Sequence, residues 1–264
     1  MSGKNVSVLR VLVGCTAAAM TASAWAQGKV VAVGDEWMVS DSAFFADPVN
    51  TTAFTLNVAN LMTGGGPGNF LIYTNNFGLT GSSFASTLAG HTLTYNASLP
   101  LTLANLSGFD GVFLAGSNGS GAANAAVLAA YVNNGGSVFV EGGTGEFGPN
   151  PANEAAGWNP FLNQFGLAFG SQWVGPNGIY NVPLNAGTHA LHAGMNGIVW
   201  SVGQEVIDLD GVPANAHTVA LYGDFTALGE SNNLGIVGVY CVPAPTAASA
   251  LGLGVLFVTR RRRA

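Results

Sequence analysis

Residues 111–140 have the sequence GVFLAGSNGSGAANAAVLAAYVNNGGSVFV, in which two apolar runs flank an alanine-rich segment. The runs 111–115 and 137–140 are typical of buried strands, and the residues from Ser120 to Asn133 have the composition of a helix. Gly135 and Gly136 provide a stop signal for that helix. A strand, a helix and a second strand joined in this way predict a βαβ unit whose two strands are parallel.

The same alternation of strands and helices extends on both sides of this unit. We expect further strands at 30–33, 70–73 and 92–95, and further helices at 49–62, 79–89 and 153–165. The C-terminal part is richer in strands, which we place at 198–202, 205–209, 218–222 and 236–240. The predicted fold is one flavodoxin-like α/β domain over residues 27–241, with a mostly parallel sheet flanked by helices and a β-richer C-terminal portion.

Composition excludes several classes of protein. Of the 264 residues, 48% are hydrophobic and only 8% are charged, which is atypical of a disordered chain. Between the two terminal segments the chain keeps one basic residue, Lys29, against all 13 acidic residues, a formal charge of −12. Because nucleic acids are bound by neutralising phosphates with Lys and Arg, this distribution excludes nucleic-acid binding.

The N-terminal segment has the layout of a secretory signal. Residues 1–26 combine a basic start (Lys4 and Arg10), an apolar alanine-rich core and an Ala24-Trp25-Ala26 cleavage motif. The sequence Leu12-Val13-Gly14-Cys15 also resembles a lipobox, which would make a lipidated Cys15 the mature N-terminus. We favour ordinary cleavage because only four residues separate Arg10 from Cys15, too few for the usual apolar core.

The C-terminal segment, residues 242–264, has three parts. A Pro-x-Pro motif (Pro243 and Pro245) precedes a short apolar stretch at 247–258, and a basic cluster follows, Arg260, Arg261, Arg262 and Arg263. The apolar stretch is shorter than the roughly 20 residues of a comfortable membrane span. The layout resembles the PEP-CTERM sorting signal of Gram-negative bacteria, with Ala244 in place of the Glu. The resemblance implies transient inner-membrane anchoring, processing by an exosortase and delivery to the cell surface or extracellular matrix. A permanent tail anchor is the alternative.

Three stretches of the body together resemble class I glutamine-amidotransferase-like domains, and in particular their ThuA-like branch. They are Gly34–Glu36 with the 57–60 segment, Phe109–Gly116 with Leu128–Val140, and His189–Met195. Catalytic members carry a nucleophilic Cys in the turn that follows the strand matching 137–140. This chain has Glu141-Gly-Gly-Thr-Gly-Glu146 there, and Cys241 is placed on the last strand. Because thiolate attack needs a thiol at that turn, we expect no amidotransferase activity.

Polar residues follow three of the predicted strands. Ligands of open α/β sheets bind beyond the carboxyl ends of the strands. This rule predicts a ligand-binding edge formed by Asp35, Glu36, Ser117, Asn118, Gly142, Gly143 and Thr144. If His189 folds over this edge, then Glu141, Glu146 and His189 are candidates for acid–base catalysis or for holding a metal. The alternative is that these residues only form turns and cap helices.

Two weaker patterns stand beside this edge. Ala115-Gly-Ser-Asn-Gly119 is similar to a nucleophile elbow, and Ser117 could form a triad with Asp208 or Asp210 and His217. Asp208-Leu-Asp210-Gly211 resembles part of a calcium loop, but Val219 stands where the bidentate Glu belongs, which favours a turn. Trp158, Trp173 and Trp200 are predicted to be core or rim aromatics, of which exposed ones could stack on sugar rings.

Three hypotheses for the function follow. The first is a secreted, non-catalytic protein of the cell surface or exopolysaccharide matrix, with no cofactor and no resident metal. The second is a weak carbohydrate-active enzyme of ThuA-like type that uses Glu141, Glu146 and His189. The third is a surface protein that binds divalent cations through its acidic body.

Overall fold

The computed structural model describes residues 28–185, 187, 189–210 and 217–242. The predicted signal at 1–26 and the sorting motif, Pro243, Pro245 and Arg260–Arg263, lie outside these residues. The described chain is built on a seven-stranded sheet in the order β10-β11-β1-β5-β4-β2-β3. Its parallel part consists of β1 (Lys29–Val33), β5 (Ser137–Glu141), β4 (Gly111–Ala115), β2 (Asn69–Ile72) and β3 (Thr92–Tyr95). On the other side of β1, β11 (Asn232–Cys241) and β10 (His217–Asp224) are antiparallel.

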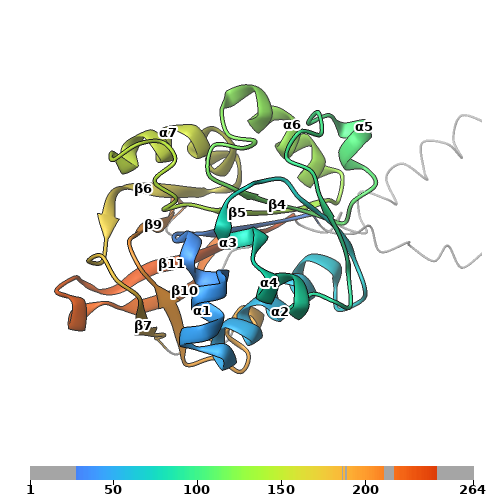
Figure 1. Cartoon of the computed structure of the whole chain (residues 1–264). Helices are drawn as coiled ribbons and strands as arrows, with labels where there is room; N and C mark the ends of the chain where they lie inside the picture. Colours follow the sequence, from blue (N-terminus) through green and yellow to red (C-terminus); the bar gives the residue numbers. More distant parts are fainter. Residues whose placement is uncertain (1–27, 186, 188, 211–216, 243–264) are drawn as a thin grey trace, which may run out of the picture.

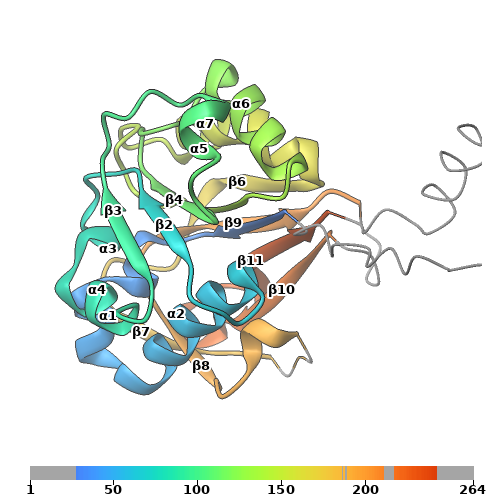
Figure 2. The same ribbon diagram turned by 90° about the vertical axis from the view of Figure 1, so that its right-hand side faces the viewer.

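Helices cover both faces of the sheet (Figures 1 and 2). One face carries α1 (Asp41–Ala46), α2 (Pro48–Thr63) and α4 (Ser82–Thr87), and the opposite face carries α5 (Leu103–Leu106), α6 (Ala122–Asn133) and α7 (Pro151–Leu162). The chain changes face because it runs from β1 outward to β2 and β3, and then back through β4 and β5 towards β1. Right-handed crossovers in opposite directions place their helices on opposite faces. The predicted α/β class, with a mostly parallel sheet between helices, is confirmed.

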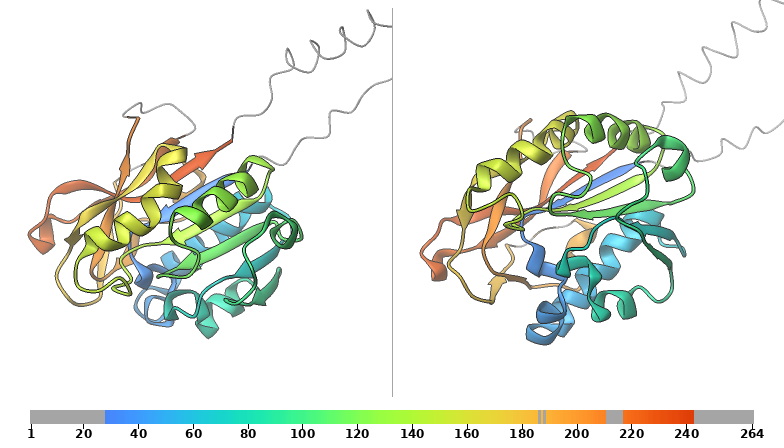
Figure 3. Two further views of the ribbon diagram at one scale, coloured as in Figure 1. Left: turned by 90° about the horizontal axis from the view of Figure 1, so that it is seen from above. Right: turned by 45° about the horizontal axis from the view of Figure 1, so that its top comes forward.

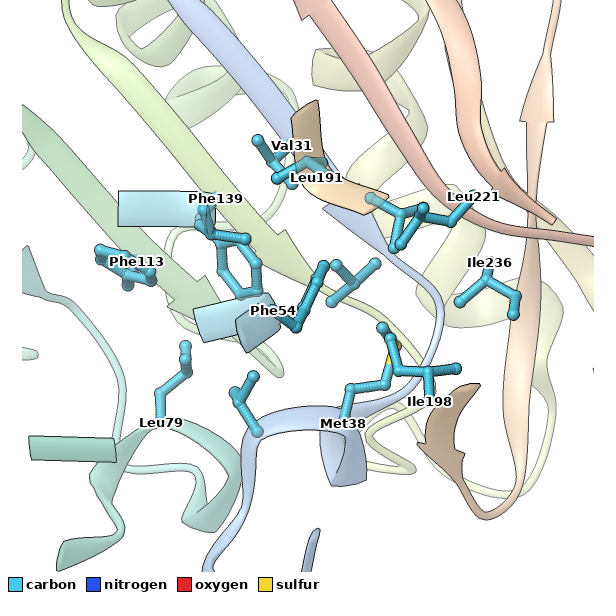
Figure 4. Packing of buried hydrophobic residues seen from close by; sticks show 14 of the residues in the cluster. Val31, Met38, Phe54, Leu79, Phe113, Phe139, Leu191, Ile198, Leu221 and Ile236 are labelled. Carbon is cyan, nitrogen blue, oxygen red and sulfur yellow. The ribbon is translucent and has the colours of Figure 1, made fainter. Parts of the chain in front are cut away.

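Two hydrophobic cores lie on the two faces of the sheet. Strand β1 contributes to both by alternation, because Val31 and Val33 pack in one core and Val30 and Ala32 in the other. Figure 4 shows the first core, to which α2 contributes Phe54 and the sheet contributes Phe113 and Phe139. The strands 111–115 and 137–141 are buried on both faces and, apart from Ser137 and Glu141, are apolar, which explains why this part of the fold was predictable from sequence.

The expected helices are present with shifted boundaries. Helix α2 begins after the N-cap Asp47, with proline at its first position, and ends at Gly64, which adopts a left-handed conformation. The prediction of a single helix at 79–89 is wrong. This segment contains α3 (Phe77–Thr80) and α4, which are separate helices because the backbone at Gly81 is extended. The helix expected at 120–133 begins at Ala122. The one expected at 153–165 consists of α7 and the 3-10 turn η2 (Asn163–Phe165).

The C-terminal part is rich in strands, as expected. Beside β10 and β11 it contains β8 (Gly197–Trp200) and β9 (Gly203–Asp208), which pair with β7 (Tyr180–Pro183) and β6 (Leu167–Val174) in two small antiparallel sheets. Strands β6 and β7, the 3-10 turn η1 (Glu36–Val39) and helix α1 were not predicted. The short turns η3 (Ala190–His192) and η4 (Thr226–Leu228) complete the described elements.

The two ends of the described body lie side by side. The backbone N–H of Val242 donates to the carbonyl of Gly28 over 2.9 Å, and Cys241 is paired with Lys29 in the β11–β1 ladder. Figure 3 shows both ends of the described chain at the same end of the sheet. Cys241 is thus at the opposite end of β1 from Asp35, too far along the sheet to replace a nucleophile after β5. Within the described ranges, no helix has the length and apolar character needed to cross a bilayer.

Candidate functional site

The topology creates a crevice beyond the carboxyl ends of β1 and β5. These strands are neighbours, but the chain leaves β1 for the face that carries α1 and α2, and leaves β5 for the face that carries α7. Diverging connections of this kind mark the point where open α/β sheets bind ligands. The segments at this point are Asp35–Glu36 after β1 and Glu141–Glu146 after β5, as the sequence predicted.

Asp35 is a buried N-cap. One carboxylate oxygen accepts from the backbone N–H of Trp37 over 3.0 Å, and the other accepts from the backbone N–H of Ser201. Complete burial raises the pKa of Asp35 to about 7, although the two backbone hydrogen bonds oppose the shift. Asp35 therefore has a clear structural role, which is to begin η1 and to tie it to the loop that follows β8.

Glu36 and Glu146 are joined by the side-chain amide of Asn76. The Asn76 Nδ2 donates to Glu36 Oε2 over 2.5 Å and to Glu146 Oε1 over 3.1 Å. Asn76 Oδ1 accepts from the backbone N–H of Gly78 over 2.8 Å, which fixes the orientation of the amide. Burial, with the neighbouring Asp35 as a smaller cause, raises the pKa of Glu36 to about 8. The two carboxyl groups thus reach one shared donor from separate strand ends.

Ser117 and Gly116 hold Glu146 from the side of β4. The backbone N–H and the hydroxyl of Ser117 both donate to Glu146 Oε2, over 3.0 and 3.2 Å. Gly116 has a φ of +65°, and a Cβ at this position would lie 2.2 Å from the Glu146 carboxyl carbon. A glycine is therefore required both for the backbone conformation and for the approach of the carboxylate.

Glu141 lies beneath these groups and is completely buried. Neither of its carboxyl oxygens has a hydrogen-bond partner, and a Cβ at Gly78 would lie 2.7 Å from Oε2 and 2.4 Å from the backbone carbonyl oxygen of Glu36. Burial, followed by the charges of Glu36 and Asp35, raises the pKa of Glu141 well above its ordinary value. Both effects favour the neutral carboxyl, because ionisation of a buried group without a partner is very costly.

The loop after β5 is held by two further buried side chains. Thr144 donates to Glu154 of α7 through its backbone N–H and through its hydroxyl, the latter over 2.7 Å. Gln204 accepts from the backbone N–H of Gly143 and donates to the carbonyls of Pro151 and Gly170. Burial raises the pKa of Glu154 to about 7 against the bonds from Thr144. These contacts tie the loop to α7 and β9 through buried side chains.

An open cleft of about 730 Å³ lies over this edge. Glu36, Gly143, Thr144 and Ser201 line it from the sheet side. Trp37, Trp173, Asn177 and Ile179 are among the residues that enclose it from η1 and from the β6–β7 segment. Both tryptophans are half-buried. The Trp37 ring packs edge-to-face on Phe77 at 4.9 Å between centroids, and Trp173 Nε1 donates to the Pro149 carbonyl over 3.0 Å. The cleft thus combines fixed aromatic rings with hydrogen-bonding groups.

The structure brings most of the predicted edge residues together, with one clear exception. Asp35, Glu36, Ser117, Glu141–Thr144 and Glu146 are at the carboxyl edge, and Asn118 lies in the turn directly after Ser117. His189 is instead the N-cap of η3, where its Nδ1 accepts from the backbone N–H of Leu191. The η3 turn is tied to α2 by bonds from Asn57 to its backbone. Among the described residues no hydrogen bond joins His189 to either glutamate, so the three do not form one catalytic group.

The weaker patterns do not converge on a site. Asp208 ends β9, which packs on β10 and β11, whereas Ser117 follows β4 on the far side of β1 and β5. The triad proposed for Ser117 is therefore not assembled through Asp208. Asp208 Oδ1 accepts from the backbone N–H of Asp210 over 2.9 Å, which forms a local turn. Gly211 lies outside the described residues.

The described part of the chain contains no preformed metal site. No group of three or more His, Cys, Asp or Glu side chains is arranged there to hold a metal ion. The acidic residues at the carboxyl edge are instead separated by Asn76, Thr144 and backbone N–H groups.

Asn76, Trp37 and Glu154 belong to the site but were not found from the sequence. Asn76 follows β2. Ligands of open α/β sheets bind beyond the carboxyl ends of the strands, and applying this rule to the end of β2 as well would have included Asn76. Trp37 lies in η1, and a turn of four residues is too short to produce a periodic pattern in the sequence. Trp158 and Trp200 are completely buried core residues, which leaves Trp173 as the rim aromatic among the three considered. Comparisons with protein-family models, curated proteins and solved structures found no match.

Proposed function

We propose that this chain is an exported protein of the cell surface or exopolysaccharide matrix, and that it binds polysaccharide in the cleft between Trp37 and Trp173. The observation that carries the proposal is that both tryptophans line one open cleft together with Glu36, Thr144 and Asn177. Aromatic rings provide flat apolar surfaces for the faces of sugar rings, and polar groups around them bind the hydroxyls. The shape fits an extended chain better than a small enclosed ligand, because the cleft is open.

Export is supported by the layout of the two terminal segments. The basic, apolar and small-residue parts of 1–26 are those of a secretory signal, and 242–264 resembles a PEP-CTERM sorting tail. Exosortase-type processing and transient anchoring in the inner membrane belong to this proposal. Immunodetection on intact and on lysed producing cells tests it. A protein found only after lysis, in the cytosolic fraction, contradicts the proposed location.

A binding role is favoured over catalysis by the groups at the turn after β5. No thiol is present there, and the hydroxyl of Ser117, in the turn after β4, donates to Glu146 and to no histidine among the described residues. The enzyme alternative needs His189 beside Glu141 and Glu146, which the geometry does not support. We therefore expect no hydrolysis of the bound polysaccharide, a result that reducing-end assays measure directly.

Substitution of the cleft aromatics tests the binding site. We expect Trp173→Ala, made in the full-length protein, to weaken binding to soluble polysaccharides in affinity electrophoresis, because the ring would no longer cover a sugar face. Phe45→Ala is the matched control, since Phe45 is an aromatic residue of α1, 92% exposed and outside the cleft lining. Equal retardation of the wild-type protein and the Trp173 variant on every polysaccharide would contradict the proposal.

A further inference from the structure

Four Asn-Gly pairs occur in the sequence, at 118–119, 134–135, 177–178 and 196–197. Such a pair can lose ammonia spontaneously, because glycine has no Cβ to hinder the approach of its backbone nitrogen to the asparagine side chain. The reaction requires that the asparagine side chain is free to turn towards this nitrogen. It also requires that the backbone N–H of the glycine is not held in a hydrogen bond. The four pairs differ in both respects.

Two of the pairs are held by hydrogen bonds. The backbone N–H of Gly135 donates to the Val132 carbonyl over 2.9 Å at the end of α6. Asn196 exchanges two hydrogen bonds with Asn50. Its backbone N–H donates to Asn50 Oδ1 over 3.0 Å, and its own Oδ1 accepts from Asn50 Nδ2 over 3.1 Å. Gly197, which follows it, begins the buried strand β8. In the first pair the nitrogen is engaged, and in the second the side chain is.

The pair at 118–119 is held by packing in the turn after β4. The backbone N–H of Ser120 donates to the Ser117 carbonyl over 3.3 Å, which closes the turn around the pair. Gly119 is buried, and a Cβ at its position would lie 2.7 Å from Leu114 Cδ2. The backbone of this pair therefore has little room to rearrange.

Asn177 and Gly178 differ from the other three pairs. They lie in the bend between β6 and β7, and both are exposed. Within the part of the chain that the structure describes, neither the Asn177 side chain nor the Gly178 N–H has a hydrogen-bond partner. The Asn177 carbonyl accepts from the Tyr180 hydroxyl over 3.2 Å, a bond that engages neither of the reacting groups. This pair alone among the four thus has both the side chain and the nitrogen free.

We propose that the Asn177–Gly178 pair is a site of spontaneous succinimide formation, at which Asn177 becomes aspartate or isoaspartate in the folded protein. The backbone nitrogen of Gly178 gives up its proton and bonds to Cγ of Asn177, and Nδ2 takes up a proton and leaves as ammonia. Water then adds to one of the two carbonyls of the ring. Cleavage of the bond between Cγ and the nitrogen gives aspartate, and cleavage on the backbone side gives isoaspartate.

The modification changes the cleft whatever the cleft binds. Asn177 is one of the residues that line it. An aspartate side chain with an ordinary pKa of about 3.9 is ionised at neutral pH. The lining thus loses the N–H donors of the amide and gains a negative charge and an acceptor-only group. Isoaspartate in addition lengthens the backbone of the bend, because the chain then runs through the former side chain.

Peptide mass spectrometry of the full-length protein, kept folded at mildly alkaline pH, follows each pair separately. Trypsin leaves the four pairs on one peptide, because no Lys or Arg occurs between Lys29 and Arg260. Digestion therefore uses pepsin, whose acidic medium also slows the reaction during handling. We expect the peptide with Asn177 to gain the mass difference between an amide and an acid at least about tenfold faster than the peptides with the other three pairs, because their contacts must open first.

Unfolding and two variants provide the controls. In guanidinium chloride the four pairs should react at similar rates, since the contacts that protect three of them are lost. Asn177→Gln should abolish the more acidic species that ion-exchange chromatography separates from the aged protein, because the longer side chain would have to form a larger ring. Asn134→Gln is the matched control and should leave the rate at which this species forms unchanged. Circular dichroism shows whether each variant is folded.

The inference is overturned by any of three results with the folded protein. They are equal rates at the four pairs, conversion of another pair before Asn177, and no conversion at Asn177 over the time in which the unfolded protein reacts. An acidic species that still forms in Asn177→Gln at the wild-type rate also overturns it. None of these results depends on the ligand of the cleft, so polysaccharide binding is tested independently.

Discussion

Replacing Glu141 by Gln should make the protein more stable at neutral pH. The carboxyl is completely buried and has no hydrogen-bond partner at either oxygen, and burial raises its pKa well above the ordinary value of 4.5. In the unfolded chain this group ionises as the pH rises above 4.5, whereas in the folded protein it stays protonated. The folded state therefore binds the extra proton, and the free energy of unfolding falls as the pH increases.

The size of the effect follows from the pH interval. Each pH unit over which only the unfolded chain is ionised lowers the free energy of unfolding by about 1.4 kcal/mol. The loss therefore grows with every pH unit over which the folded protein keeps the proton, and even one such unit is a noticeable part of the 5–15 kcal/mol that roughly covers the stability of most domains. Glutamine has nearly the same shape and does not titrate. The variant and the wild-type protein should therefore be about equally stable near pH 4 and should diverge as the pH rises.

Urea unfolding at pH 4, 5.5 and 7, followed by tryptophan fluorescence, measures this divergence. The completely buried Trp158 and Trp200 provide the signal. Glu230→Gln, at an exposed position, should match the wild-type protein at each pH. A difference between Glu141→Gln and the wild-type protein that is the same at every pH, or a variant less stable at pH 7, would refute the assignment of a neutral, unpartnered carboxyl.

The other predictions concern the same edge of the sheet. Gly116→Ala should lower the free energy of unfolding, measured in urea, by more than Gly64→Ala. Both glycines have a left-handed backbone, which costs an alanine roughly 1–2 kcal/mol, but of the two only position 116 has a group, the Glu146 carboxyl, in the place of the new Cβ. Equal losses would contradict this. Gln204→Leu should lower the free energy of unfolding by about 3 kcal/mol or more, since three buried hydrogen bonds to Gly143, Pro151 and Gly170 are lost. A loss under about 1 kcal/mol would show that the loop does not depend on this side chain. The wild-type protein itself should lose stability between about pH 4.5 and 7, because Asp35 and Glu154 have pKa values raised to about 7, so that the unfolded chain ionises these groups over that range while the folded protein still holds their protons. Potentiometric proton uptake on refolding at pH 6 checks the sign.

The sheet was predictable because its strands carry a simple signal. The runs 111–115 and 137–140 are apolar except for Ser137, as expected for a central parallel strand that is buried on both faces, and turns or a glycine pair separate them from the helix between. The position of the site followed from the same elements, since strand ends on one edge must lie together. The strand order could not be derived, because nothing local in the sequence fixes that β1 lies between β5 and β11.

The elements that were missed lack periodicity or are very short. Strand β6 has the sequence LAFGSQWV, in which four buried residues are followed by two exposed ones, so neither alternation nor a continuous apolar run is present. The η1 turn and α1 have four and six residues and depend on the capping side chains of Asp35 and Ser40. The segment 79–89, expected to form one helix, belongs to two helices because the backbone at Gly81 is extended. His189 was placed at the site only by resemblance, and tertiary packing of η3 on α2 decides otherwise.

The pairing of β1 with β11 determines how the molecule can be tethered. Residues 28 and 242 are hydrogen-bonded neighbours at the amino-terminal end of β1, and the tryptophan cleft opens beyond its carboxyl-terminal end. The chain therefore enters and leaves the described body at the end of β1 that lies opposite the cleft. A partner held at either terminus would approach the body from that end, and the mouth of the cleft would stay open to a long ligand.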